Sequence, residues 1–205
     1  MDKKEILIQS LKKKGFSEHI LKAFSAVERG DFMLNEIKDY AYEDNAFPIG
    51  FQQTISQPYT IAAMLELLQL KKNLKVLEIG SGSGYVLSLI SNITGGKGKV
   101  YGIERIKELA ENSKKSLKQY KNIKVFNRNG FDGLIEHSPF DRILISAASE
   151  KIPEKLTSQL KEKGIIVAPL GNRFSQNLVS YQKFKGKLKL EKRIPGFIFV
   201  PLIDQ

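Results

Sequence analysis

The chain has 205 residues, a formal net charge of +11 and no cysteine. This length favours one domain, spanning residues 1–205, and the lack of cysteine excludes disulfides and thiolate chemistry. No stretch approaches the ~18 apolar residues that span a membrane, and the first residues lack the apolar core of a signal peptide, so we expect a cytoplasmic protein with no membrane partner.

The positive charge raises the question of nucleic-acid binding, because clustered lysines neutralise phosphates. The lysines are scattered along the whole sequence, and no aromatic residues are interleaved with them as a stacking platform. This pattern favours a solvated basic surface over a nucleic-acid groove, and no nucleic-acid partner is expected.

Helical periodicity dominates residues 1–72. Apolar stripes at 6–11 and 20–27 predict two helices, and a third is predicted from about residue 58 to 68, where four apolar side chains share one face. The segment 30–57 predicts irregular structure. It is long for a connection, and long loops tend to be lids or binding loops.

Strands and helices alternate from residue 75 onward. The predicted strands are 75–79, 99–103, 123–127, 142–146 and 164–168, and the predicted helices are 85–92, 106–120 and 153–162. This alternation predicts an α/β fold with a doubly wound, mostly parallel sheet over residues 73–205. The hairpin pattern around 183–188 predicts antiparallel strands at the C-terminal edge.

A glycine loop joins the first strand to its helix. Residues 76–85 read VLEIGSGSGY, with glycines at alternate positions 80, 82 and 84. Glycines permit a tight turn and a close approach of the backbone to a cofactor, and the N–H groups at a helix start favour an anion. The GxGxG spacing differs from the dinucleotide fingerprint GxGxxG and from the GxxxxGK[ST] phosphate loop. An ordinary tight turn remains the alternative.

Glu104 ends the second strand, 24 residues after Gly80. In a doubly wound sheet, ligands bind beyond the carboxyl ends of the strands. A carboxylate at this place can accept hydrogen bonds from both hydroxyls of a ribose. The alternative is a solvated acid at a strand end.

Together these features resemble the class I S-adenosylmethionine-dependent methyltransferases, which have a Rossmann-like fold. The segment 50–58, GFQQTISQP, resembles the signature of the protein-L-isoaspartate (D-aspartate) O-methyltransferases, and similar segments continue in order to residue 203. Members of the class that methylate base amino groups usually carry Asn/Asp-Pro-Pro-aromatic after the fourth strand. Here that place reads SAAS at 146–149.

The resemblance implies methyl transfer from S-adenosyl-L-methionine to the free α-carboxylate of L-isoaspartyl residues in damaged peptides and proteins. It also implies that Ser56 is catalytic and orients this carboxylate through its hydroxyl. The alternative is that Ser56 only caps the helix after it. Without cysteine or a paired-histidine motif, no metal site is expected.

The same resemblance implies the cofactor contacts. Glu104 is expected to hold the ribose and Arg105 to flank the adenine, while Thr54 and Ile55 cover the cofactor with Ser56. The residues expected around its methionine part are those of the glycine loop, namely Gly80, Ser81, Gly82, Ser83 and Gly84. The two serines of this loop have a plain turn role as their alternative.

The sequence departs from the family after the third strand, where Gly-Asp-Gly is usual and Arg128-Asn129-Gly130 stands here. The Asn129 carbonyl can accept the hydrogen bond from the adenine amino group, but without charge. The difference of about 1 kcal/mol predicts roughly fivefold weaker cofactor binding. Two alternative functions stay open, an RNA methyltransferase and a non-catalytic paralogue that binds S-adenosylmethionine.

Overall fold

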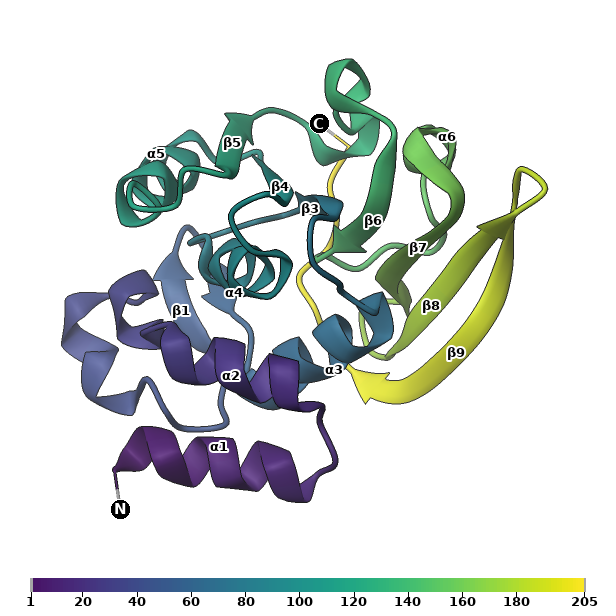
Figure 1. Cartoon of the computed structure of the whole chain (residues 1–205). Helices are drawn as coiled ribbons and strands as arrows, with labels where there is room; N and C mark the ends of the chain where they lie inside the picture. The colour runs from purple at the N-terminus through teal and green to yellow at the C-terminus, as the bar shows by residue number, and fades with distance from the viewer. Residues whose placement is uncertain (1, 205) are drawn as a thin grey trace.

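A computed structural model describes residues 2–204. The N-terminal helices lie against one side of a twisted sheet, and a long hairpin extends the sheet at its C-terminal edge (Figure 1). The α-helices are α1 (Lys3–Lys13), α2 (Glu18–Ala26), α3 (Pro58–Leu68), α4 (Tyr85–Thr94), α5 (Lys107–Ser116) and α6 (Glu154–Gln159). The short 3-10 helices are η1 (Arg29–Phe32), η2 (Asn35–Tyr40), η3 (Gly130–Asp132) and η4 (Ile135–His137).

Seven strands form the main sheet, in the order β5-β4-β3-β6-β7-β8-β9. Their bounds are β3 (Lys75–Ile79), β4 (Lys99–Glu104), β5 (Ile123–Asn127), β6 (Phe140–Ile145), β7 (Leu160–Gly171), β8 (Gln176–Phe184) and β9 (Lys187–Phe197). The strands from β5 to β7 pair in parallel, whereas β8 and β9 are antiparallel. This confirms the predicted fold class, including the antiparallel C-terminal edge.

The order of the strands places the switch point of the sheet between β3 and β6. The chain first adds β4 and β5 on one side of β3, and later adds β6 and β7 on the other. The crossover segments on either side of such a point diverge, which leaves a crevice at the carboxyl ends of the strands. Residues that follow β3, β4 and β6 therefore face one shared space.

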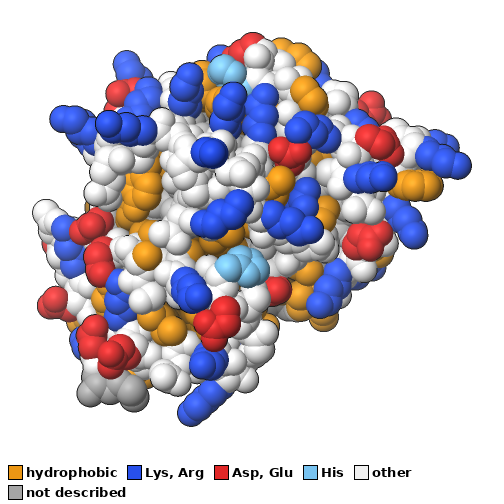
Figure 2. All heavy atoms as spheres, viewed as in Figure 1, with side chains coloured by type: hydrophobic (Ala, Val, Ile, Leu, Met, Phe, Trp, Pro, Cys, Tyr) orange, Lys and Arg blue, Asp and Glu red, His pale blue; other side chains and the backbone are white. Residues whose placement is uncertain are grey.

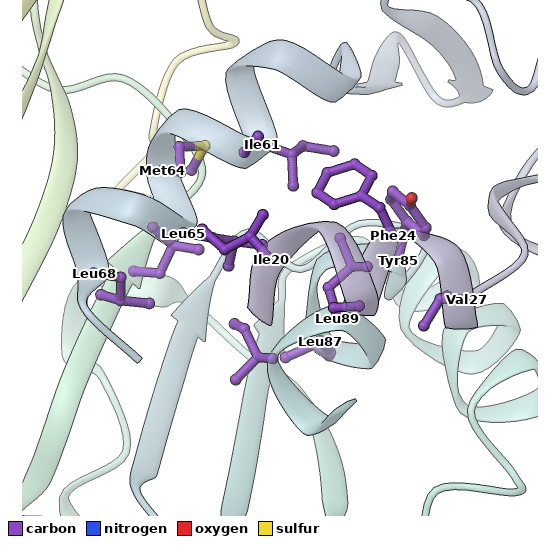
Figure 3. Packing of buried hydrophobic residues seen from close by; sticks show 14 of the residues in the cluster. Ile20, Phe24, Val27, Ile61, Met64, Leu65, Leu68, Tyr85, Leu87 and Leu89 are labelled. Carbon is purple, nitrogen blue, oxygen red and sulfur yellow. The ribbon is translucent and has the colours of Figure 1, made fainter. Parts of the chain in front are cut away.

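Alternation along each strand divides the core between the two faces of the sheet. In β3, Val76 belongs to the cluster on the helical N-terminal side, while Leu77 and Ile79 belong to the cluster on the α6 side. On the first face, side chains of α2, α3 and α4 point toward one another (Figure 3). Residues 2–72 thereby share a core with the sheet.

Several predicted boundaries were wrong. Residues 30–57 are not irregular, because they contain η1, η2 and a hairpin of β1 (Phe47–Gly50) and β2 (Gln53–Ile55). These elements are too short to give a periodic signal. The helix predicted over 153–162 ends at Gln159, since Leu160 instead pairs with Phe140 of β6 and starts β7.

The helix predicted over 106–120 is shorter as well, and its surroundings explain the end. α5 stops at Ser116, and a turn follows in which the Tyr120 N–H donates to the Leu117 carbonyl at 2.8 Å. The buried side chain of Leu117 then packs against the start of α4, where it lies close to Gly84. Tertiary packing thus ends a helix that the local pattern would continue.

The surface carries mixed charge. On the face seen in Figure 2, Lys and Arg side chains are spread widely, with Asp and Glu among them. This distribution agrees with the solvated basic surface favoured above. In residues 2–204, no helix combines the length and the apolar character needed to cross a bilayer.

Candidate active site

The glycine loop follows β3 at the switch point. Gly80, Gly82 and Gly84 all have positive φ, at 77°, 51° and 89°. The N–H groups of Gly80 and Ser81 both donate to the carbonyl of Ile103 in β4, at 2.8 and 3.1 Å. The loop is therefore fastened to the end of the neighbouring strand, with its backbone turned toward the crevice.

Glu104 holds this loop from the end of β4. Its Oε2 accepts the Gly82 N–H at 2.9 Å, and its Oε1 accepts the Ile106 N–H at 2.9 Å. The side chain is buried, with 6% of its surface exposed. Each carboxylate oxygen has a further lone pair, so Glu104 can still accept hydrogen bonds from the hydroxyl groups of a ligand beside it.

Three adjoining cavities occupy the crevice. The glycine-loop and outer cavities each have a volume of about 70 Å³, and the inner cavity has about 40 Å³. The glycine-loop cavity includes Gly80, Gly82, Glu104, Arg105 and Gly130 in its lining. The inner cavity includes Thr54, Ile55, Ser56, Ser81 and Ser83, and the outer cavity includes Ala46, Thr54, Ser56, Thr60 and Phe199.

Thr54 and Ser146 line all three cavities, so the three spaces meet beside these side chains. Ser56 lines the inner and the outer cavity. It therefore stands at the boundary between these two spaces.

Ser56 does not act as the cap of α3. The N-cap of this helix is Gln57, which makes no side-chain cap bond, and the free N–H of Tyr59 is bound by Asp44 Oδ1 at 2.8 Å. The backbone of Ser56 is held instead, because its carbonyl accepts a hydrogen bond from the Arg29 guanidinium at 3.0 Å. The Ser56 hydroxyl is therefore available to hydrogen-bond a ligand in the two cavities that Ser56 lines.

The inner cavity contains polar groups that sequence reasoning missed. Glu78 is 1% exposed, and its Oε1 accepts the Ser146 hydroxyl at 2.8 Å. Glu78 Oε2 and Ser81 Oγ are buried and have no hydrogen-bond partner in residues 2–204. Burial raises the pKa of the Glu78 carboxyl to about 8, while the Ser146 hydrogen bond opposes this shift.

The sequence does carry a signal for Glu78. It is a carboxylate between the apolar residues Leu77 and Ile79 of β3, and a buried acid of this kind needs a partner. Glu78 and Ser81 both line the inner cavity, so this cavity has a polar wall between β3 and the glycine loop. In the described residues no cluster of three or more His, Asp or Glu side chains is arranged to hold a metal ion.

Two of the predicted site residues line none of the three cavities. A Cβ on Gly84 would lie 2.7 Å from Leu117 Cδ1, so this glycine is required by packing against the segment after α5. Asn129 caps η3, since its Oδ1 accepts the Phe131 N–H at 2.9 Å, and its Nδ2 donates to Asp204 Oδ1 at 3.3 Å. The remaining predicted residues line at least one cavity.

Comparison with known proteins finds that the chain is similar to protein-L-isoaspartate O-methyltransferases. The profile of the protein-L-isoaspartate(D-aspartate) O-methyltransferase family matches residues 2–205. A protein-L-isoaspartate O-methyltransferase of Dictyoglomus turgidum is 44% identical over 203 residues, which cover 98% of this chain and 90% of that protein.

Solved structures agree. A protein-L-isoaspartate O-methyltransferase superposes with a TM-score of 0.86 at 30% identity, covering 97% of this chain and 65% of that chain. A protein of the same description from Plasmodium falciparum, in complex with S-adenosyl-L-homocysteine, superposes with a TM-score of 0.87 at 26% identity and covers 100% of both chains.

Proposed function

The chain belongs to the protein-L-isoaspartate(D-aspartate) O-methyltransferase family. We propose that it transfers a methyl group from S-adenosyl-L-methionine to the α-carboxylate of L-isoaspartyl residues in damaged proteins, and that the three cavities hold the two substrates. One observation carries the assignment of residues: Ser56 lines both the inner and the outer cavity. A side chain in that place can contact the methyl acceptor beside the methyl donor.

The cofactor fits the first two cavities by the chemistry of their walls. We assign the adenosine part to the glycine-loop cavity, with Glu104 accepting the ribose hydroxyls and Arg105 and Gly130 beside the adenine. The amino-acid part is assigned to the inner cavity, which Glu78 and Ser81 line, and its ammonium group would favour the ionised form of the Glu78 carboxyl. When bound, S-adenosylmethionine supplies an activated sulfonium methyl group.

The outer cavity is assigned to the isoaspartyl residue. Its α-carboxylate has an unperturbed pKa near 4 and is already ionised at neutral pH, so no general base is needed. The Ser56 hydroxyl donates to this carboxylate and orients one oxygen toward the inner cavity. The walls made by Thr60 and Phe199 displace water from the nucleophile. Catalysis by this chain then consists of alignment and desolvation.

This assignment separates the leading function from its alternatives. An RNA methyltransferase would transfer label from S-adenosylmethionine to RNA, and a non-catalytic paralogue would bind the cofactor without turnover. The test supplies labelled S-adenosylmethionine with an isoaspartyl peptide, the matching aspartyl peptide and RNA. We expect label in the isoaspartyl peptide alone. Label in RNA, or cofactor binding without any labelled product, would overturn the proposal.

A further inference from the structure

We infer that Arg29 is a positioning residue that holds two walls of the outer cavity in register. The inference rests on the proposed function, because that function assigns this cavity to the methyl acceptor. Arg29 itself lines none of the three cavities, so any effect on the reaction passes through the backbone that it binds.

The guanidinium of Arg29 is fully buried, with 0% of its surface exposed. Its NH1 group donates to the carbonyls of Ala41 and Glu43, at 2.9 and 3.3 Å. Its NH2 group donates to the carbonyls of Asn45 and Ser56, at 2.9 and 3.0 Å. One planar group thus joins the segment 41–45, which leads into β1, to the residue that follows β2.

Both backbone segments reach the outer cavity. Asn45 precedes Ala46, which lines that cavity, and Ser56 lines it from the other segment. The NH1 and NH2 groups of the guanidinium form a rigid, planar fork of donors. This fork therefore sets the spacing of the four carbonyls as well as binding them. A shift of Asn45 relative to Ser56 would change the width of the pocket that aligns the acceptor carboxylate.

Further contacts hold the segment 41–45 to its neighbours. The Tyr42 hydroxyl donates to Glu28, which also pairs with Lys4 of α1, and Asp44 binds the Tyr59 N–H at the start of α3. Glu28 and Arg29 are adjacent in the sequence, so one short stretch anchors the segment from two sides. Arg29 and its four carbonyl partners, together called the anchor, are therefore held in place by the surrounding fold near Ser56.

Burial lowers the pKa of Arg29 to about 10, and the group stays charged at neutral pH. A buried cation is costly unless it is hydrogen-bonded, and four carbonyls accept from the NH1 and NH2 groups without a carboxylate, while Nε is buried and has no partner in residues 2–204. The positive charge also lies behind the residue that receives an anionic substrate group, where it favours binding of that anion.

The test replaces Arg29 by lysine and uses Arg142→Lys as the matched control. Arg142 also donates to backbone carbonyls, those of Leu68 and Gln69 at 2.7 and 3.2 Å, but at the opposite end of α3. Both changes keep the charge and lose the fork. We expect Arg29→Lys to lower kcat/KM for an isoaspartyl peptide by about 10- to 100-fold. For Arg142→Lys we expect a lower Tm and kcat/KM within about twofold of wild type.

Affinity for S-adenosylmethionine is measured on the same proteins and should change less than about twofold in Arg29→Lys, since Arg29 lines neither the glycine-loop cavity nor the inner cavity. Asp44→Ala, an exposed change in the same segment, provides a second variant should Arg29→Lys fail to fold. We expect it to lower kcat/KM about three- to tenfold. Unchanged kcat/KM in the folded variant, or an equal loss in Arg142→Lys, overturns the inference.

Amide hydrogen exchange separates this inference from the proposed function. Arg29→Lys, or Asp44→Ala in its place, should speed exchange at residues 41–47 and 55–59 and leave the glycine loop unchanged. If the wild type does not methylate isoaspartyl peptides but these segments loosen in the variant, the proposed function fails and the anchor stands. If the wild type is active and the segments do not loosen, the anchor fails alone.

Discussion

Replacement of Ser56 by alanine tests the assignment of the acceptor site most directly. The variant removes one hydroxyl at the boundary of the inner and outer cavities. A hydrogen bond to a charged group contributes about 1.5–3 kcal/mol, which corresponds to roughly 10- to 150-fold in kcat/KM. Because Ser56 is only half-buried, solvent weakens the bond, and we expect a loss in the lower part of this range.

The structure also predicts what the variant leaves unchanged. Ser56 does not cap α3, so the free energy of unfolding should stay within about 0.5 kcal/mol of wild type. Initial rates of label transfer to an isoaspartyl peptide, at saturating cofactor, give kcat and KM. Ser158→Ala is the matched control, since Ser158 lies in α6 and lines none of the three cavities. A Ser56→Ala enzyme within twofold of wild type, or an equal loss in Ser158→Ala, would refute the reasoning.

Three further predictions follow from buried and crowded groups. The pKa of Glu78 is raised from 4.5 to about 8 by burial, so the stability that its neutral form contributes is complete below pH 4.5 and is lost as the pH rises toward 8. The free energy of unfolding in urea is measured at pH 5 and at pH 8, and Glu78→Gln should reduce the difference between the two values by on the order of 1–3 kcal/mol. An unchanged difference would contradict this prediction. Asn129 lines none of the three cavities, so we expect Asn129→Asp to leave the affinity for S-adenosylmethionine in calorimetry within about twofold of wild type. A several-fold tighter affinity would show that the residue at position 129 contacts the cofactor. Gly84→Ala should cost about 1–3 kcal/mol of unfolding free energy, because φ is 89° and the added Cβ meets a side chain, whereas Gly96→Ala enters open space and serves as control. Equal effects of the two changes would show that packing at Gly84 is not the cause.

Local patterns were sufficient for much of the fold. The bounds of β3 and β5 are those predicted, because short runs rich in β-branched and apolar residues mark strands. The glycine loop and Glu104 were also placed correctly at the ends of neighbouring strands. In a parallel sheet those ends share one edge, so strand order brings together residues that lie far apart in the sequence.

Other features depend on partners that periodicity does not reveal. Residues 160–162 fall within the predicted helix, yet Leu160 pairs with Phe140 of β6 and the three residues belong to β7. The hairpin of β1 and β2 is too short to be recognised, although it carries Thr54 into the crevice. In each case a contact made across the fold outweighed the preference of the local sequence.

By itself, the sequence determined the fold class, the glycine loop and the family, because each depends on residue types at short spacings. Only the tertiary structure decided how the site is assembled. It turned Glu78 toward the inner cavity beside Ser81, and it joined Arg29 to the carbonyl of Ser56, 27 residues away. The physical reason is that a buried charge is stabilised by whichever groups the fold brings to it, and those groups come from separate elements of the chain.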